Sequence, residues 1–129
     1  MNNDKNIPNL DLRGNILLVD DSSVNLCVLQ GILSSFYNLR IDTAISGLET
    51  IEKIKKTDYN IIFMDHYMPE MDGVETTIQL RELNCLSIII ACTSSDLPKE
   101  YYISKGFNDL IQKPINVILL CTLLNKYLK

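Results

Sequence analysis

The chain has 129 residues, of which 47% are hydrophobic and 22% charged, and its formal net charge is −4. This length suits one globular domain with its own core and leaves no room for a second. No run approaches the roughly 18 apolar residues that span a bilayer, and the Asn-rich, acidic N-terminus lacks the regions of a signal peptide, so we predict a cytoplasmic protein. The acidic balance argues against binding of nucleic-acid phosphates and suits a site that collects cations.

Four cysteines lie far apart in the chain, without a CxxC pair or a Cys/His cluster. Three of them sit within apolar runs, where cysteine behaves as a small hydrophobic residue. We therefore predict buried, reduced thiols at Cys27, Cys85, Cys92 and Cys121.

Residues 1–14 are polar and include Pro8 and Gly14, which predicts a flexible tail or linker followed by one folded domain over 15–129. From Asn15 onward, short apolar runs alternate with longer segments of helical period. That alternation predicts a parallel sheet with crossover helices. The predicted strands cover residues 16–19, 39–44, 60–64, 87–92 and 109–112.

The segments between and after these strands have the spacing of amphipathic helices. The first carries its apolar residues at Val24, Val28, Leu29, Ile32, Leu33 and Phe36, the second at Leu48, Ile51 and Ile54, and the last at Val117, Leu120, Leu123, Leu124 and Tyr127. Predicted caps are Ser46 with Glu49, Asp72 with Glu75 in a helix that ends near Leu83, and Asp96 before Pro98 in a helix that Gly106 ends.

Polar side chains follow four of the five predicted strands. Asp20 and Asp21 come after the first, Asp65 after the third, Thr93 after the fourth and Lys113 after the fifth. We predict an α/β fold, a flavodoxin-like doubly wound sheet of five parallel strands in the order 2-1-3-4-5 with five helices. In such a sheet the carboxyl ends share one edge, and ligands bind where the strand order reverses. One such aspartate alone is often only a helix cap, but separate caps have no reason to converge on one edge.

Convergence of these residues predicts a phosphoryl-transfer site. Three close carboxylates repel one another, so they hold a proton or bind a hard cation, and Mg²⁺ with its oxygen ligands is the natural choice. A carboxylate oxygen of Asp65 would then attack in line, while Lys113 neutralises the phosphoryl oxygens and Thr93 donates a hydrogen bond to them. The expected product is an aspartyl phosphate.

Four motifs resemble those of the response regulator receiver, or CheY-like, family. They are LLVDD at 17–21, FMDHYMPEMDG at 63–73, CT at 92–93 and QKP at 112–114, and the resemblance runs from about Asn15 to the end. The DDSSVNLCV and MDHYMPEMDG segments are most similar to receivers of hybrid sensor histidine kinases. The chain is thus either such a receiver or a small stand-alone regulator.

The resemblance implies a role for each matching residue. For the phosphoryl group, Asp65 corresponds to the phosphoacceptor, Thr93 to the switch hydroxyl and Lys113 to the phosphate-pairing lysine. For the metal, Asp21 corresponds to a direct ligand, Asp20 to an acidic residue that acts through water, and Tyr67 to a ligand through its backbone carbonyl. Pro114 corresponds to a proline whose preceding peptide bond is cis. The implied cofactor is Mg²⁺.

The resemblance also implies a two-component phosphorelay and its partners. A histidine kinase or histidine phosphotransfer domain would supply the phosphoryl group, and a downstream protein would bind the face formed by the fourth helix, fifth strand and fifth helix. The domain itself would contact neither nucleic acid nor membrane, although it could be the cytoplasmic part of a membrane-bound hybrid kinase. It would catalyse only its own phosphotransfer and autodephosphorylation.

Leu110 departs from the family pattern, and Tyr67 is singled out for the size of its side chain. Leu110 stands where the family carries Tyr or Phe, so a coupling of Thr93 to a ring at that position cannot be assumed. Tyr67 is bulky, and we hypothesise that it slows the attack of water on the acyl phosphate.

Three aromatic side chains near these motifs carry simpler expectations. We expect His66 to face solvent in a loop, since it has no second His or Cys at ligand spacing. Tyr101 and Tyr102 form a partner surface, or one of them packs inward.

Two other function classes stay open at this point. A receiver-fold interaction module that works without phosphorylation is compatible with Leu110, although such modules typically lose an acidic residue or the lysine, and this chain keeps both. An aspartyl phosphatase of the haloacid dehalogenase type is disfavoured, because it needs a second Asp two residues beyond its nucleophile, where this chain has Tyr67.

Overall fold

The computed structural model describes residues 12–36 and 38–128, and its centre is one sheet of five parallel strands in the order β2-β1-β3-β4-β5. The strands are β1 (Gly14–Val19), β2 (Leu39–Ala44), β3 (Ile61–Asp65), β4 (Ile88–Thr93) and β5 (Asp109–Gln112). The predicted fold class is confirmed. Residues 1–11 of the predicted tail lie outside the described residues, whereas Leu12 is buried and Gly14 begins β1.

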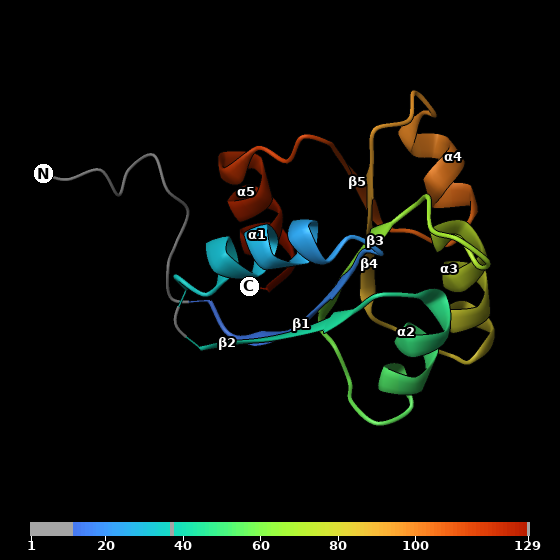
Figure 1. Cartoon of the computed structure of the whole chain (residues 1–129), viewed down its shortest axis with the longest axis horizontal. Coiled ribbons are helices and arrows are strands. Elements are labelled where there is room, and N and C mark those ends of the chain that lie inside the picture. The colour runs from blue at the N-terminus through green and yellow to red at the C-terminus, as the bar shows by residue number, and fades with distance from the viewer. Residues whose placement is uncertain (1–11, 37, 129) are drawn as a thin grey trace, which may run out of the picture.

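Five helices cover the sheet: α1 (Ser23–Leu33), α2 (Gly47–Ile54), α3 (Gly73–Glu82), α4 (Lys99–Ser104) and α5 (Val117–Leu128). Figure 1 shows α1 and α5 together on one face and α2, α3 and α4 on the other. Within the described part of the chain, every helix is too short or too polar to cross a lipid bilayer.

The alternation of side chains along each strand produces two separate cores. In β3, Ile61 and Phe63 pack with α1 and α5, whereas Ile62 and Met64 pack with α2, α3 and α4. Because both faces are covered, the inner strands are apolar throughout, and for this reason they were readable in the sequence as continuous apolar runs.

Side-chain caps fix the start of three helices. Ser22 accepts from Asn25 N–H, Ser46 accepts from Glu49 N–H, and Asp72 forms a complete capping box with Glu75.

The capping box predicted for Ser46 and Glu49 is only half formed, and the cap predicted at Asp96 is wrong. The Glu49 carboxylate accepts from Ile45 N–H instead of the cap residue, at 2.7 Å. Asp96 caps nothing: α4 begins at Lys99 with Pro98 as its N-cap, because the loop before it is held in turns by hydrogen bonds of Ser95.

Several hydrophobic residues predicted to face the core are exposed. Val24 and Val28 of α1 are 70% and 57% exposed, because α1 contacts the sheet chiefly through Leu26 and Leu33. Leu48 and Val117 are likewise exposed. Helical spacing identified the apolar residues but could not decide which of them the sheet covers.

The cysteine prediction holds for two of four residues. All four are free thiols; Cys92 and Cys121 are buried, Cys85 is half-buried, and Cys27 is exposed on α1. Burial raises the pKa of the Cys92 thiol to about 12, so it stays protonated and serves as a small core residue.

Candidate functional site

The sheet register brings the polar strand ends to one edge. Asp65 pairs with Cys92 across β3 and β4, and Thr93 pairs with Gln112 across β4 and β5. Asp20 follows β1, whose last residue lies opposite the residue before Asp65. The carboxyl ends of β1, β3, β4 and β5 therefore surround one point, as parallel strands require.

Three carboxylates form the acidic part of this site. Ligand oxygens of Asp20, Asp21 and Asp65 all lie within 4.8 Å of one another. Asp20 and Asp65 are 4% and 6% exposed, whereas Asp21 faces solvent. An all-oxygen donor set that is open on one side fits Mg²⁺, which keeps water ligands and binds phosphate oxygens.

Lys113 joins two of these carboxylates. Its Nζ donates to Asp65 Oδ1 at 3.0 Å and to Asp20 Oδ2 at 3.2 Å. Burial opposes the lysine charge, but the hydrogen bonds and charges of the two carboxylates outweigh burial and raise the pKa of Lys113. The lysine therefore stays protonated. Its backbone N–H donates to Thr93 O at 2.9 Å, and the peptide bond to Pro114 is cis, as predicted.

The pKa of Asp65 is raised to about 6 from an ordinary value of 3.8. Burial is the largest cause; the Lys113 hydrogen bond lowers the pKa, and the charges of Asp20 and Asp21 raise it. Near neutral pH the carboxylate is mostly ionised and poorly solvated, which is the state that a carboxylate nucleophile needs.

Thr93 lies at the end of β4 and is 1% exposed. Its Oγ accepts a hydrogen bond from Ser95 N–H at 3.0 Å. The hydroxyl proton is not used in that bond, so it can be donated to another group.

Three residues to which the motifs assigned no role support the site. Asn25, in the first turn of α1, donates from Nδ2 to Asp20 Oδ2 at 3.3 Å, and Ser22 N–H donates to Asp20 Oδ1 at 2.9 Å. Gly73 N–H donates to His66 O at 2.7 Å, and a Cβ at Gly73 would lie 2.1 Å from Asp65 O. Asn25 was visible in the sequence as part of the DDSSVNLCV motif. Gly73 was visible as the last residue of the FMDHYMPEMDG motif, although no role was assigned to it.

His66 is buried, which corrects the expectation of a solvent-facing loop residue. It is 5% exposed, because its N–H bonds to Cys92 O and extends the pairing of β3 with β4, and its Nδ1 lies 2.7 Å from the Tyr102 hydroxyl. Burial lowers its pKa. Among the described residues, the group able to hold a metal does not include His66.

The tyrosines near His66 differ in burial. Tyr102 is fully buried and Tyr101 is half-buried, so of the two predicted arrangements the inward-packing one is correct. Tyr67 is 57% exposed, and its ring stacks on His66 with centroids 4.1 Å apart.

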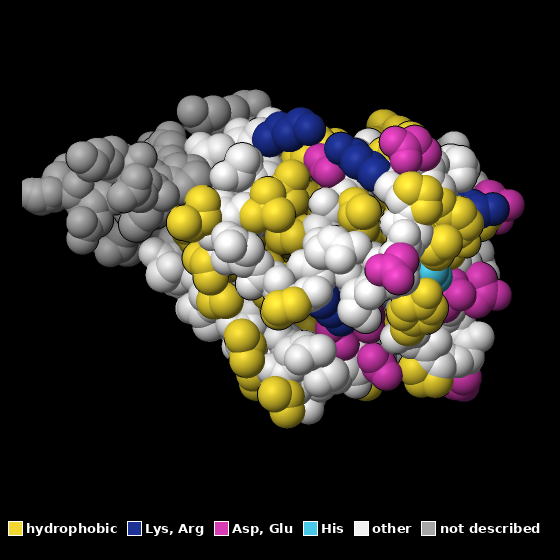
Figure 2. All heavy atoms as spheres, turned by 90° about the horizontal axis from the view of Figure 1, so that it is seen from above, with side chains coloured by type: hydrophobic (Ala, Val, Ile, Leu, Met, Phe, Trp, Pro, Cys, Tyr) yellow, Lys and Arg dark blue, Asp and Glu magenta, His cyan; other side chains and the backbone are white. Residues whose placement is uncertain are grey.

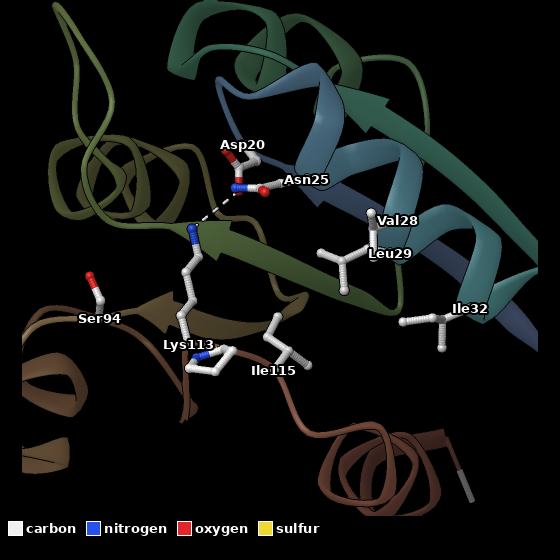
Figure 3. A pocket seen from close by; sticks show the side chains of 9 residues that line it. Asp20, Asn25, Val28, Leu29, Ile32, Ser94, Lys113 and Ile115 are labelled. Carbon is white, nitrogen blue, oxygen red and sulfur yellow. Dashed lines mark hydrogen bonds and ion pairs between the residues drawn. The ribbon is translucent and has the colours of Figure 1, made fainter.

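A groove of about 490 Å³ opens beside Lys113 and Asp20. It is lined by Asp20, Asn25, Val28, Leu29, Ile32, Ser94, Lys113, Pro114 and Ile115. Figure 3 shows Lys113 and Asn25 both directed toward Asp20, with the apolar side chains of α1 facing Ile115. Figure 2 shows hydrophobic side chains beside acidic ones on this side of the molecule.

Known proteins are similar to this chain in sequence. The chain is 37% identical over 115 residues to hybrid signal transduction histidine kinase B of Dictyostelium discoideum, covering 78% of the chain and 6% of that protein. It is 36% identical over 104 residues to the autoinducer 2 sensor kinase/phosphatase LuxQ of Vibrio harveyi, a match that covers 78% of this chain and 12% of that protein. The chain therefore spans only a small part of the length of these relatives.

Two solved structures are similar along nearly the whole chain. The receiver domain of Ssk1 from Saccharomyces cerevisiae, in a co-crystal with the histidine phosphotransfer protein Ypd1, has a TM-score of 0.85 at 25% identity and covers 92% of this chain and 90% of that one. The receiver domain of sensor histidine kinase PA1611 from Pseudomonas aeruginosa was solved with a magnesium ion coordinated in its active site cleft. It has a TM-score of 0.81 at 28% identity, and the match covers 90% of this chain and 98% of that one.

The family model of the response regulator receiver domain matches residues 16–125. This range includes every strand end described above and all but the last few residues of α5. The chain belongs to the response regulator receiver family of two-component signalling.

Proposed function

We propose that Asp65 accepts a phosphoryl group from a phosphohistidine, and that the chain signals through this phosphorylated state. The observation that carries the proposal is the pairing of a buried carboxylate with a protonated lysine, Lys113 Nζ lying 3.0 Å from Asp65 Oδ1, beside two further carboxylates. Convergence of all these groups also favours phosphorylation over an interaction module that works without it. We also propose that the chain is located in the cytoplasm, either as a stand-alone protein or as the cytoplasmic part of a hybrid kinase.

The chemistry is an in-line phosphoryl transfer. An Asp65 oxygen forms a bond to phosphorus as the bond from phosphorus to the donor imidazole nitrogen breaks, and the imidazole leaves with that electron pair. Lys113 neutralises charge on the phosphoryl oxygens, and the free hydroxyl proton of Thr93 is donated to one of them. Hydrolysis of the acyl phosphate returns the carboxylate, so the chain catalyses only its own phosphotransfer and autodephosphorylation.

The acidic side chains would hold Mg²⁺. Asp21 and Asp65 would bind the ion directly, Asp20 through water, and Tyr67 through its backbone carbonyl. When bound, the ion supplies positive charge to the transferred phosphoryl group. In its absence, Lys113 partly neutralises the cluster through its bonds to Asp20 and Asp65.

The groove beside Lys113 is where we place the donor. A phosphohistidine on a helical partner must bring its imidazole to Asp65, and the exposed apolar residues of α1 adjoin the site on the side that Asp20 and Lys113 line. A histidine kinase or histidine phosphotransfer protein with an apolar surface around its histidine fits this face. That the Ssk1 receiver was solved with a histidine phosphotransfer protein supports the choice of partner.

Intact mass spectrometry tests the chemistry. The chain is incubated with Mg²⁺ and acetyl phosphate as wild type, as Asp65→Asn, and as the exposed-loop control Asp96→Asn. We expect a gain of one phosphoryl group in wild type and in the Asp96 variant only. No gain in wild type, or an equal gain in the Asp65 variant, would overturn the assignment.

A second pair of variants tests the donor face. Val28→Lys places a charge at the groove, and Leu48→Lys places one on α2, where the parent side chain is similarly exposed. With phosphorylated Ypd1 as donor, we expect only the Val28 variant to lose transfer, by about tenfold or more, because a desolvated charge opposes docking. Both variants should react normally with acetyl phosphate. Equal transfer to the two variants would place the donor elsewhere.

A further inference from the structure

A chain of hydrogen bonds connects the segments after β3 and β4 to α4. The Tyr102 hydroxyl lies 2.7 Å from Nδ1 of His66 and 3.1 Å from Oγ of Ser95. Tyr102 is fully buried and comes from α4, His66 directly follows Asp65, and Ser95 lies two residues beyond Thr93. One side chain of α4 thus contacts both loops that leave the phosphorylation site.

Ser95 joins this chain to Thr93. Its N–H donates to Thr93 Oγ at 3.0 Å, and its own Oγ accepts from Leu97 N–H at 3.0 Å. When the Thr93 hydroxyl turns toward a phosphoryl group, its bond to Ser95 must lengthen or reorient. Because Ser95 Oγ also bonds to Tyr102, that change reaches the helix that carries Tyr102.

Leu110 offers no such connection. It is half-buried on β5 in the core beneath α2, α3 and α4, and it has neither a ring nor a hydroxyl that could follow the site. Tyr102 lies in the same core, where its ring makes edge contacts with His66 and Phe107 at centroid distances of 5.4 Å. Packing fixes the ring, so its hydroxyl is the group able to exchange partners.

We propose that the Tyr102 hydroxyl is the positioning group that transmits the phosphorylated state of Asp65 to α4, through Ser95 on one side and His66 on the other. The inference rests on the proposed function, since without an acyl phosphate there is no state to transmit. The two remain separable, because phosphoryl transfer uses the strand-end residues, whereas transmission uses a hydroxyl on α4.

Hydrogen exchange followed by mass spectrometry tests this coupling. Exchange over residues 94–104 is compared with and without phosphorylation by acetyl phosphate and Mg²⁺ in wild type, Tyr102→Phe and Tyr101→Phe. The first variant loses one oxygen and keeps the ring, and the second makes the same change one residue away on a half-buried ring. Tyr102→Phe removes the hydrogen bonds to both His66 and Ser95, and loss of even one bond of ordinary net strength corresponds to about fivefold. We therefore expect the phosphorylation-dependent change to fall by about fivefold or more in Tyr102→Phe and to persist in Tyr101→Phe.

The outcomes separate the two proposals. Intact mass on the same samples reports phosphoryl gain, so a wild type that gains nothing refutes the proposed function and this inference with it. Normal phosphorylation with an undiminished α4 response in Tyr102→Phe refutes the inference alone. Ser95→Ala controls for altered packing in Tyr102→Phe, since it leaves Tyr102 unchanged. We expect this variant also to lose the exchange response of α4. A retained response in Ser95→Ala would refute the route from Thr93 through Ser95 to Tyr102.

Discussion

Replacing Asp65, the proposed phosphoacceptor, with its neutral isostere in Asp65→Asn should stabilise the fold. The pKa of Asp65 rises from 3.8 to about 6, and each pKa unit corresponds to about 1.4 kcal/mol. Ionised Asp65 therefore costs the folded state at most about 3 kcal/mol. Because Asp21 leaves one side of the site open to solvent, screening reduces this value, and we expect a gain of about 1 to 2 kcal/mol in the free energy of unfolding.

The sign of this effect depends on pH. The folded state binds the Asp65 proton more tightly than the unfolded chain does, so the penalty is absent below pH 3.8, grows as the pH rises, and is complete above about pH 6. The stabilisation of Asp65→Asn should therefore be full at pH 7.5 and close to zero near pH 4.

Urea unfolding followed by far-ultraviolet circular dichroism measures this gain, in EDTA so that no divalent cation offsets the repulsion. Asp96→Asn, at an exposed loop position, should change stability by less than about 0.5 kcal/mol at either pH. A less stable Asp65 variant at pH 7.5 would mean that the ion pair with Lys113 outweighs burial. An equal gain at both pH values would mean that ionisation is not the cause.

Three further predictions concern Tyr67, Arg81 and Gly73. Tyr67→Asn should shorten the phosphorylated lifetime, measured as loss of the acyl phosphate over time; an unchanged rate refutes a shielding role. Arg81→Lys should lower the free energy of unfolding by about 2 kcal/mol in urea titrations, because the guanidinium donates to three backbone carbonyls and to Asn108 Oδ1, and an amine cannot reproduce that fork. Gly73→Ala should cost about 3 kcal/mol and reduce phosphoryl gain, since its Cβ would lie 2.1 Å from Asp65 O; normal stability would show that the loop relaxes freely.

The strands of the sheet and the polar residues at its carboxyl edge could be predicted from the sequence alone. Strands buried on both faces must be apolar throughout, so their positions were visible as runs, and the residue that follows each run lies at the common edge of a parallel sheet. For this reason Asp20, Asp65 and Lys113 could be placed together although up to 93 residues separate them.

Which side chains near that edge are buried could not be predicted locally, because burial depends on packing between distant segments. His66 is polar and sits in a loop motif, yet it is buried, because Tyr102, 36 residues later, provides its hydrogen-bond partner. Val28 has the spacing of a core residue, yet it faces outward, since α1 contacts the sheet through other positions. Burial depends on what packs against a residue, and that partner comes from a distant segment which local periodicity does not specify.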